Sequence, residues 1–371
     1  MTGSGGDPAR ASLDADVLRW MREPAWRRDD ARFEALALRV FAHQFEHCAP
    51  YRRFCEGRGR TPRSLESSVE IPPVPTGGFK ELVLTSFPLA RSVHRFRTSG
   101  TTAGARGVLY LDTLALYEAS LLPSFRRHVL PDLRDGARAR IAVLAPSARE
   151  LPDSSLSHMF EVVLRELGDA SSAYFVRGGE LDALSLLRFL EEASAAAVPV
   201  ALCGTAFAFV HLLDALAARG RAFALPAGSR ALETGGFKGR ARVRPQRELY
   251  AEIEARLGIP AARIVNQYGM TELGSQFYDS VLLEPGALRR KLAPPWTRVL
   301  IVDPLGGNPL PPGRTGAIVV QDLANTGSVF AVQTADLGVA RGDGFEVIGR
   351  EPGAEERGCS IALDELLGGA A

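Results

Sequence analysis

The chain of 371 residues has few cysteines and no excess of charge of either sign. Its four cysteines show no C-x-x-C pair, so neither a disulfide framework nor a cysteine zinc motif is expected; they are Cys48, Cys55, Cys203 and Cys359. The 44 Lys and Arg residues balance 43 Asp and Glu residues. This balance excludes a dedicated nucleic-acid binder that depends on a strongly basic surface.

Long hydrophobic runs are also lacking. The most apolar stretch, residues 198–218, contains Pro199, His211 and Asp214, and residues 1–10 have no apolar signal-peptide core. We therefore expect a cytoplasmic protein with reduced thiols and no membrane span. A hydrophobic content of 46% at this length is that of an ordinary globular chain with two or three packing units.

Short apolar runs alternate with stretches of helical periodicity along the middle of the chain. The predicted strands are residues 108–111, 140–144, 173–176, 200–203, 229–233 and 263–266. The predicted helices are residues 114–129, 155–167, 181–197, 206–218 and a segment from Pro245 to Leu257. This alternation is typical of an α/β fold, in which loops at the strand ends are available for a site.

The two ends of the chain have different patterns. Ser12 is predicted to cap an opening helix, and further helical spacing continues to Phe45. After residue 292, short strands separated by Gly, Pro and Asn turns predict an antiparallel β subdomain, with strands at 298–302, 317–321, 328–332 and 345–348. The expected organisation is therefore a helical region (1–70), an α/β core (71–291), a β subdomain (292–350) and a short tail (351–371).

Three motifs carry the chemistry. The first is a run of hydroxyls and glycines, residues 98–107, just before a predicted strand. Such a loop exposes backbone N–H groups and hydroxyl donors that can wrap a polyphosphate, although a polar turn is an equal alternative. It is not a Walker loop, because no Gly-Lys-Ser/Thr ends it. The candidate ATP ligands in this loop are Thr98, Ser99, Gly100, Thr101, Thr102, Gly104 and Arg106.

The second motif, residues 266–272, follows a predicted strand. The ring of Tyr268 can stack on adenine, Gly269 follows it, and Thr271 can bond a phosphate or carboxylate oxygen. Glu272 is a hard oxygen ligand suited to Mg²⁺ that bridges phosphates. The plain alternative is a strand-to-helix turn with Glu272 at the helix start.

The third motif begins at Thr334-Ala335-Asp336. Asp336, expected after a strand, is suited to accept hydrogen bonds from ribose hydroxyls, and Arg350 can bond sugar or phosphate oxygens. Taken alone, this region reads as a series of β-turns.

The three motifs in this order resemble those of the adenylate-forming superfamily, which contains acyl-CoA synthetases, adenylation domains and firefly-type luciferases. Its motifs read TSGTTG-x-P-K-G, Y-G-x-T-E and T-G-D-L. The segment 233–236 resembles the family's adenine-pocket glycines, which adds Gly235 and Gly236 to the ATP ligands. The resemblance covers about residue 71 to the end, and implies the layered α/β fold of the family's large N-terminal domain, use of ATP and Mg²⁺, and Glu272 as the magnesium ligand.

The sequence departs from the family pattern in two of the motifs and in the C-terminal lid domain. Ala103, Ala105 and Ala335 replace family residues, and Arg106 keeps a positive charge where the family has lysine. Relatives that make acyl-CoA carry a C-terminal lid with a catalytic lysine, but here only twelve residues follow Cys359 and no lysine follows Lys291. We therefore expect no lid in this chain.

This layout resembles the acyl-protein synthetases of bacterial luminescence. The resemblance implies that a carboxylic acid, most simply a fatty acid, is activated as acyl-AMP and loaded onto Cys359, then passed to a protein partner such as a reductase-like or carrier protein. It makes Cys359, Thr271 and Glu272 the catalytic residues. Two alternatives stay open: transfer to coenzyme A or a carrier phosphopantetheine, and a non-catalytic nucleotide- or acyl-binding scaffold. Roles for Lys80, Lys238 and His211 also stay open.

Overall fold

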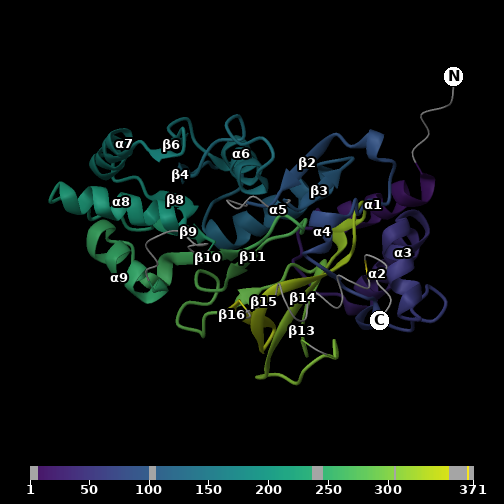
Figure 1. Ribbon diagram of the computed structural model, residues 1–371. Coiled ribbons are helices and arrows are strands. Elements are labelled where there is room, and N and C mark those ends of the chain that lie inside the picture. The colour runs from purple at the N-terminus through teal and green to yellow at the C-terminus, as the bar shows by residue number, and fades with distance from the viewer. Residues whose placement is uncertain (1–6, 100–105, 236–244, 305, 351–365, 367–371) are drawn as a thin grey trace. The chain divides into compact units, whose positions relative to one another are not determined.

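A computed structural model describes residues 7–99, 106–235, 245–304, 306–350 and 366 (Figure 1). The chain divides into two compact units. The first unit comprises Met1–Pro123, Met270–Gln276 and Leu292–Ala371, and the second comprises Ser124–Gly269 and Phe277–Lys291. Helix α5, Ala115–Val129, and strand β12, Lys291–Leu292, both cross the boundary between the units in sequence.

The second unit contains a mainly parallel sheet with the strand order β11-β10-β9-β8-β4-β5. Only β11 runs antiparallel, against β10. The strands are β4 (Arg140–Leu144), β5 (Ala173–Tyr174), β8 (Val200–Thr205), β9 (Arg230–Thr234), β10 (Ile264–Tyr268) and β11 (Phe277–Asp279). A separate short hairpin pairs β6 (Val176–Arg177) with β7 (Glu180–Leu181). The parallel order confirms the α/β class predicted from the alternating pattern.

Helices connect these parallel strands, and local capping residues fix where they begin. They are α6 (Ser155–Leu167), α7 (Ala183–Ala195), α8 (Ala206–Ala218) and α9 (Gln246–Leu257). Ser154, Asp182 and Thr205 each accept a backbone N–H of the first turn of α6, α7 and α8. The left-handed backbone of Gly258, with φ of 70°, ends α9. The apolar faces of α7, α8 and α9 form a core with the almost fully buried strands β4 and β8.

The first unit contains an antiparallel sheet made by the C-terminal strands. Strands β13 (Thr297–Val302), β14 (Thr315–Asp322), β15 (Ala331–Arg341) and β16 (Gly344–Arg350) pair in sequence order. The short β1 (Val74–Pro75) adds to β15 in parallel. This sheet is the antiparallel region that the turn-rich sequence predicts.

Three helices begin the first unit: α1 (Pro8–Met21), α2 (Asp30–His47) and α3 (Ala49–Gly57). The prediction that Ser12 caps the opening helix is wrong, because the N-cap of α1 is Asp7, five residues earlier, with Pro8 in the first turn. Helix α2 packs on the C-terminal sheet: the rings of Phe33 and Phe330 lie 5.9 Å apart, and the buried Gln44 accepts the N–H of Phe330 at 2.9 Å.

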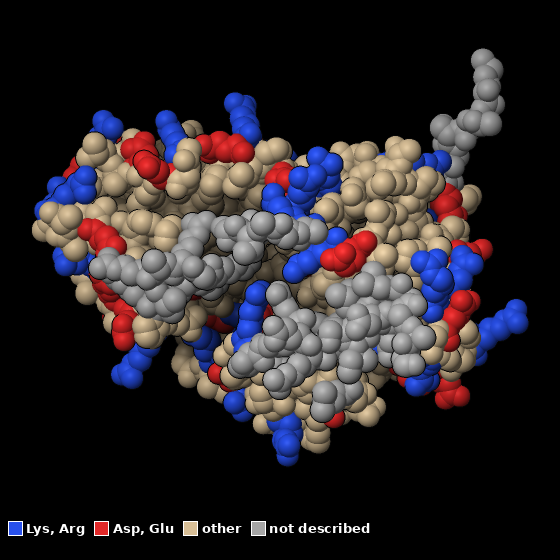
Figure 2. Space-filling model, viewed as in Figure 1, with Lys and Arg blue, Asp and Glu red and all other residues tan. Residues whose placement is uncertain are grey.

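Another prediction differs from the structure in detail. The strand predicted at 173–176 is interrupted at Phe175, so that β5 pairs with β4 whereas β6 turns back on β7 across two glycines of positive φ. Helix α4 is only Gly78–Glu81. None of the described helices is long and apolar enough to cross a membrane. On the face drawn in Figure 2, cationic and anionic side chains are interspersed, as the net charge of +1 leads one to expect.

Candidate functional site

The hydroxyl- and glycine-rich loop joins the two strands of a hairpin in the first unit, β2 (His94–Arg97) and β3 (Val108–Leu111). Thr98 and Gly107 close the base of this loop: the Thr98 N–H donates to the Gly107 carbonyl and the Gly107 N–H donates to Thr98 Oγ1, both at 2.9 Å. Arg106 Nε donates to the Thr98 carbonyl at 2.6 Å, and its side chain is exposed. Ser99 is exposed as well. Gly100, Thr101, Thr102, Ala103, Gly104 and Ala105 lie outside the described residues.

Glu272 lies beside the base of that loop. A Cβ added to Gly107 would stand 3.6 Å from Glu272 Oε1 and 3.1 Å from Thr98 Cγ2, so the three residues are neighbours. Glu272 is only 6% exposed, and its backbone carbonyl accepts the Asn325 side-chain N–H at 2.9 Å. Thr271, which is half-buried, and the buried Glu272 form a turn, so Glu272 does not begin a helix. The first unit therefore brings Glu272 of the second motif next to Thr98 and Gly107 of the first.

A buried hydrogen-bond network holds the segment that contains Glu272. Trp296 Nε1 donates to Ser120 Oγ at 2.9 Å, and Ser120 shares a 2.8 Å hydrogen bond with Ser275. Ser275 in turn donates to Asp322 Oδ1 at 2.8 Å. Complete burial raises the pKa of Asp322 to about 6. Because Ser275 is three residues from Glu272, this network fixes the backbone that carries the candidate magnesium ligand.

The third motif lies within a long strand. Asp336 is in the middle of β15, not after a strand as predicted, because β15 stays paired with β16 as far as Arg350. Asp336 and Arg350 are register partners, and Arg350 Nε donates to Asp336 Oδ1 at 3.4 Å. The Asp336 side chain is 16% exposed and that of Arg350 is 64% exposed. The structure thus pairs the two residues that were selected from the sequence.

The remaining candidate ATP ligands belong to the second unit. Tyr268 ends β10, and Gly235, with φ of 77°, directly follows β9. These strands are parallel neighbours, with Gln267 opposite Thr234, so both residues stand at the same sheet edge. Carboxyl ends of adjacent parallel strands are the usual place for ligands in such sheets. Gly269 is exposed, whereas Gly236 and Lys238 lie outside the described residues.

A buried polar cluster just inside that edge was not predicted. Lys291 Nζ donates to Asp279 Oδ1 at 2.7 Å, to the Asn266 carbonyl at 2.8 Å and to Asn266 Oδ1. The Asn266 side chain also donates to the Glu233 carboxylate, and Arg289 bonds Asp279 Oδ2 at 2.5 Å. The side chains of Lys291 and Asp279 are 7% and 3% exposed. The signal in the sequence was Lys291, the last lysine of a lysine-poor chain, because a buried lysine requires polar partners.

Electrostatics differ within this cluster. Burial raises the pKa of Glu233 to about 7, although the Asn266 hydrogen bond and the Lys291 charge oppose the shift. Burial also lowers the pKa of Lys291, against the attraction of Asp279. The cluster thus contains one carboxylate with several donors, Asp279, and one carboxyl group, Glu233, that is about half protonated near pH 7.

The thiols of the described residues are structural. Cys48, Cys55 and Cys203 are buried and unpaired. Burial raises the pKa of each, that of Cys55 to about 12, so these three thiols stay protonated near neutral pH and are poor nucleophiles. Cys359 lies outside the described residues. Lys80 is exposed on α4, and His211 is exposed on α8, not packed in the interior.

The C-terminal segment has one described residue, Leu366, which is 2% exposed. A Cβ added to Gly78 would come within 2.5 Å of Leu366 Cδ2. The next residue, Phe79, has its Cβ 3.5 Å from the Cβ position of Gly107. Leu366 therefore packs close to the base of the loop between β2 and β3.

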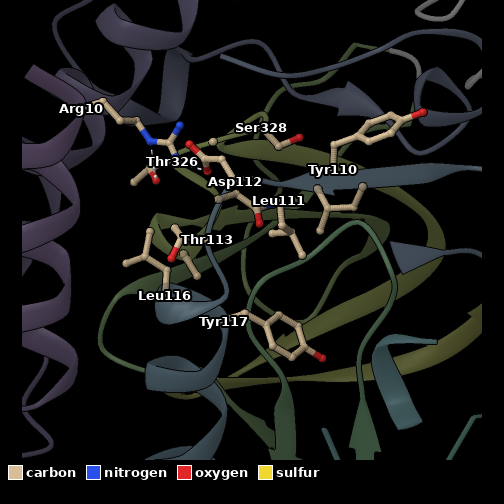
Figure 3. A pocket seen from close by; sticks show the side chains of 13 residues that line it. Arg10, Tyr110, Leu111, Asp112, Thr113, Leu116, Tyr117, Thr326 and Ser328 are labelled. Atoms are coloured by element: carbon tan, nitrogen blue, oxygen red, sulfur yellow. Dashed lines mark hydrogen bonds and ion pairs between the residues drawn. The ribbon is translucent and has the colours of Figure 1, made fainter. Parts of the chain in front are cut away.

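Figure 3 shows a pocket of the first unit lined by Arg10, Asp112, Thr326 and their neighbours. Arg10 pairs with Asp112 at 2.9 Å and Asp14 at 3.4 Å, and donates to Thr326 Oγ1 at 3.3 Å. The space inside is only about 10 Å³, room for one water molecule. This pocket lies where Arg10 of α1 contacts Asp112 and Thr326, and it is too small for an organic acid.

Comparison with known structures gives the fold. A 2-hydroxyisobutyryl-CoA ligase with 2-HIB-AMP, in the postadenylation state, is similar with a TM-score of 0.64 and 17% identity, covering 86% of this chain and 67% of the ligase. An open form of that ligase with 2-HIB-AMP and CoA gives 0.62 and 17%, covering 86% and 70%. The fold is therefore that of the adenylate-forming ligases.

A family comparison is more specific. The sequence profile of the acyl-protein synthetases, LuxE, matches residues 10–368. The chain belongs to this family and is an adenylate-forming ligase. A search of curated proteins gave no significant match.

Proposed function

We propose that this protein activates a fatty acid as acyl-AMP and transfers the acyl group to Cys359, from which a partner protein takes it. The proposal rests on family membership, on the order of the three motifs and on the neighbouring positions of Thr98, Gly107 and Glu272. That neighbourhood is the observation that carries it, because it joins a phosphate-binding loop to a carboxylate ligand. We place the reaction in the cytoplasm, where buried thiols such as Cys48 stay reduced.

In the first step, a carboxylate oxygen of the acid attacks the α-phosphorus of ATP. The bond from that phosphorus to the bridging oxygen breaks, pyrophosphate leaves, and a mixed acyl–phosphate anhydride forms. Arg106, fixed at the base of the loop by Thr98, supplies positive charge for the phosphates. Thr271 is proposed to bond the reacting oxygens, and Asp336 the ribose hydroxyls. Gly235 and Tyr268 are proposed to line the adenine site.

The residues present fit a magnesium ion. Glu272 offers a hard oxygen donor next to the loop that would bind the phosphates, and its backbone is fixed by Asn325. When bound there, Mg²⁺ would offset the negative charge that develops on the phosphates.

In the second step, the Cys359 sulfur attacks the acyl carbonyl, the carbon–oxygen bond to AMP breaks, and the thiol proton goes to solvent. The position of Leu366 supports this assignment. Leu366 follows Cys359 by seven positions in the sequence, a stretch that spans at most about 25 Å. Leu366 packs at Gly78, beside the base of the phosphate loop, so the connection is short enough for the sulfur to reach an adenylate bound there.

The test uses labelled fatty acid and ATP with the full chain. Wild type is expected to give a hydroxylamine-sensitive protein thioester and ATP–pyrophosphate exchange. Cys359→Ala should lose the thioester and keep the exchange, and Cys203→Ala, which removes a buried thiol, should keep both in its folded fraction. A thioester that persists in Cys359→Ala would falsify the acceptor assignment.

Other outcomes separate the alternatives. Turnover of Cys359→Ala to acyl-CoA or acyl-carrier protein at the wild-type rate would assign the acceptor to a pantetheine thiol. Absence of exchange with every acid in a panel of varied length, while ATP still binds, would identify a non-catalytic module. Because each buried methylene contributes about 0.8 kcal/mol, the same panel reports the preferred chain length.

A further inference from the structure

A group of metal-ligand side chains that belongs to none of the three motifs lies where the start of α1 meets the end of α2. Asp7 is the N-cap of α1, and His43 and His47 are one turn apart in the last part of α2. One ligand atom from each residue lies within 4.8 Å of those of the other two. Residues four apart on a helix face the same side, so both imidazoles face Asp7.

The two distances from Asp7 to the imidazole nitrogens match those between ligand atoms around an ion. Asp7 Oδ1 accepts the Ala9 N–H at 3.0 Å and is used by the cap. Asp7 Oδ2 lies 3.4 Å from His43 Nδ1 and 3.6 Å from His47 Nε2, and it is buried without a hydrogen-bond donor among the described residues. A charge-assisted hydrogen bond would measure about 2.7–2.9 Å. Tetrahedral zinc with bonds of about 2.1 Å keeps its ligand atoms about 3.4 Å apart.

The hydrogen bond of His47 fixes which ring nitrogen is available. His47 Nδ1 lies 2.9 Å from the His43 carbonyl oxygen, which can only accept, so Nδ1 carries the hydrogen. In the neutral ring, Nε2 then presents its lone pair to Asp7 Oδ2, another acceptor. A cation between the two atoms relieves this repulsion, and a ligating histidine usually donates its second N–H to a carbonyl in this way.

We propose that Asp7, His43 and His47 bind a divalent transition metal, with zinc as the representative ion. Two imidazole nitrogens and one carboxylate oxygen are a zinc donor set, and a fourth position is open to water because the side chains of His47 and Asp7 are 37% and 33% exposed. The site also lies at the C-terminal end of α2, where the helix dipole favours a cation.

The surrounding charges are compatible with an ion. Arg10, which follows Asp7 in the first turn of α1, is already paired with Asp14 and Asp112. An ion here would fasten the beginning of α1 to the end of α2, residues that are otherwise distant in sequence. Its role is therefore structural, and the proposal is independent of the acyl-transfer chemistry.

The experiment measures zinc binding to the full chain after chelator treatment, by competition with a chromophoric chelator and by calorimetry. Wild type is expected to bind one zinc ion and to show a higher melting temperature with zinc. Co²⁺ should give the intense visible bands of a tetrahedral site. Loss of a neighbour of a metal ligand costs about 10–100-fold in affinity, so loss of a ligand itself should cost at least about 100-fold.

Two variants and a control make the test specific. Asp7→Ser keeps the helix cap but removes the carboxylate, and His47→Gln changes a partly exposed side chain, so both should fold and lose zinc affinity. His211→Gln, exposed on α8, should bind like wild type. Absence of zinc binding by wild type overturns the proposal. Zinc affinity in Asp7→Ser and His47→Gln equal to that of wild type also overturns it, because the metal is then bound elsewhere, for example by cysteines.

Discussion

Two buried glutamates, one in each unit, have contrasting surroundings. Glu272 in the first unit stands beside the base of an exposed loop of glycines and hydroxyls, and its backbone is fixed by Asn325. Glu233 in the second unit is bonded by the Asn266 side chain, and Asn266 is bonded in turn by Lys291. Both glutamates are nearly inaccessible, at 6% and 4% exposure.

Burial alone therefore does not show whether a carboxylate serves a ligand or the fold. The neighbours of the side chain distinguish the two glutamates. Glu272 lies beside a loop that is proposed to bind phosphates, whereas Glu233 lies in a cluster with Lys291, whose three N–H groups are all engaged. We expect substitutions near Glu272 to act on catalysis, and substitutions around Glu233 to act on stability.

The largest effect is expected for Lys291→Met. The change keeps the volume of the side chain and removes the Lys291 donor from Asp279 Oδ1 and from the Asn266 carbonyl. Breaking a buried ion pair in this way should lower the free energy of unfolding by about 3–5 kcal/mol. Urea unfolding measures it, with the exposed Lys80→Met as a control that should change little. A change below 1 kcal/mol in Lys291→Met would contradict a structural role of the cluster.

For Glu272→Gln, we expect ATP–pyrophosphate exchange to fall about 100-fold or more, because a metal-held charge is worth several kcal/mol in the transition state. The nearly isosteric change should alter the free energy of unfolding by about 1 kcal/mol or less. Glu166→Gln, at an exposed position of α6, serves as the control. Undiminished exchange in folded Glu272→Gln would remove Glu272 from the magnesium site.

A smaller effect is expected of Glu233→Gln on the pH dependence of the free energy of unfolding. The folded state keeps the Glu233 proton up to a pKa of about 7, whereas the unfolded chain loses it near 4.5. The folded state binds more protons in that interval, so this group lowers stability as pH rises from about 5 to about 7. Glu233→Gln should remove about 1–3 kcal/mol of that loss, measured by urea unfolding at both pH values. Parallel pH dependence in the two proteins would show that Glu233 does not titrate there.

Much of the fold could be predicted from the sequence because its signals are local. The limits of β3, β4, α6 and α8 agree with the prediction to the residue, since each apolar run is bounded by a cap or a turn. Ser12 was wrongly chosen as a cap although Asp7-Pro8 carries the stronger start signal, with a side-chain acceptor followed by proline. Asp336 was placed after a strand because its pairing with Arg350 on β16 is not visible in a single segment.

The candidate sites divide in the same way. Thr98, Arg106 and Glu272 were found because they lie in recognisable motifs, and their roles in catalysis stay predictions. The cluster of Glu233 and Lys291 was missed because its members lie far apart in the sequence and meet only through the pairing of β9, β10 and β11. The same holds for Asp7 and His47, which belong to different helices.

The contact between Leu366 and Gly78 has an evolutionary consequence. The leucine methyl group occupies the space that a side chain at position 78 would need. In relatives that keep this contact, a bulkier residue at position 78 should accompany a smaller residue at position 366. Correlated change at these two positions, 288 positions apart in the sequence, would show that the segment after Cys359 is selected together with its contact on α4.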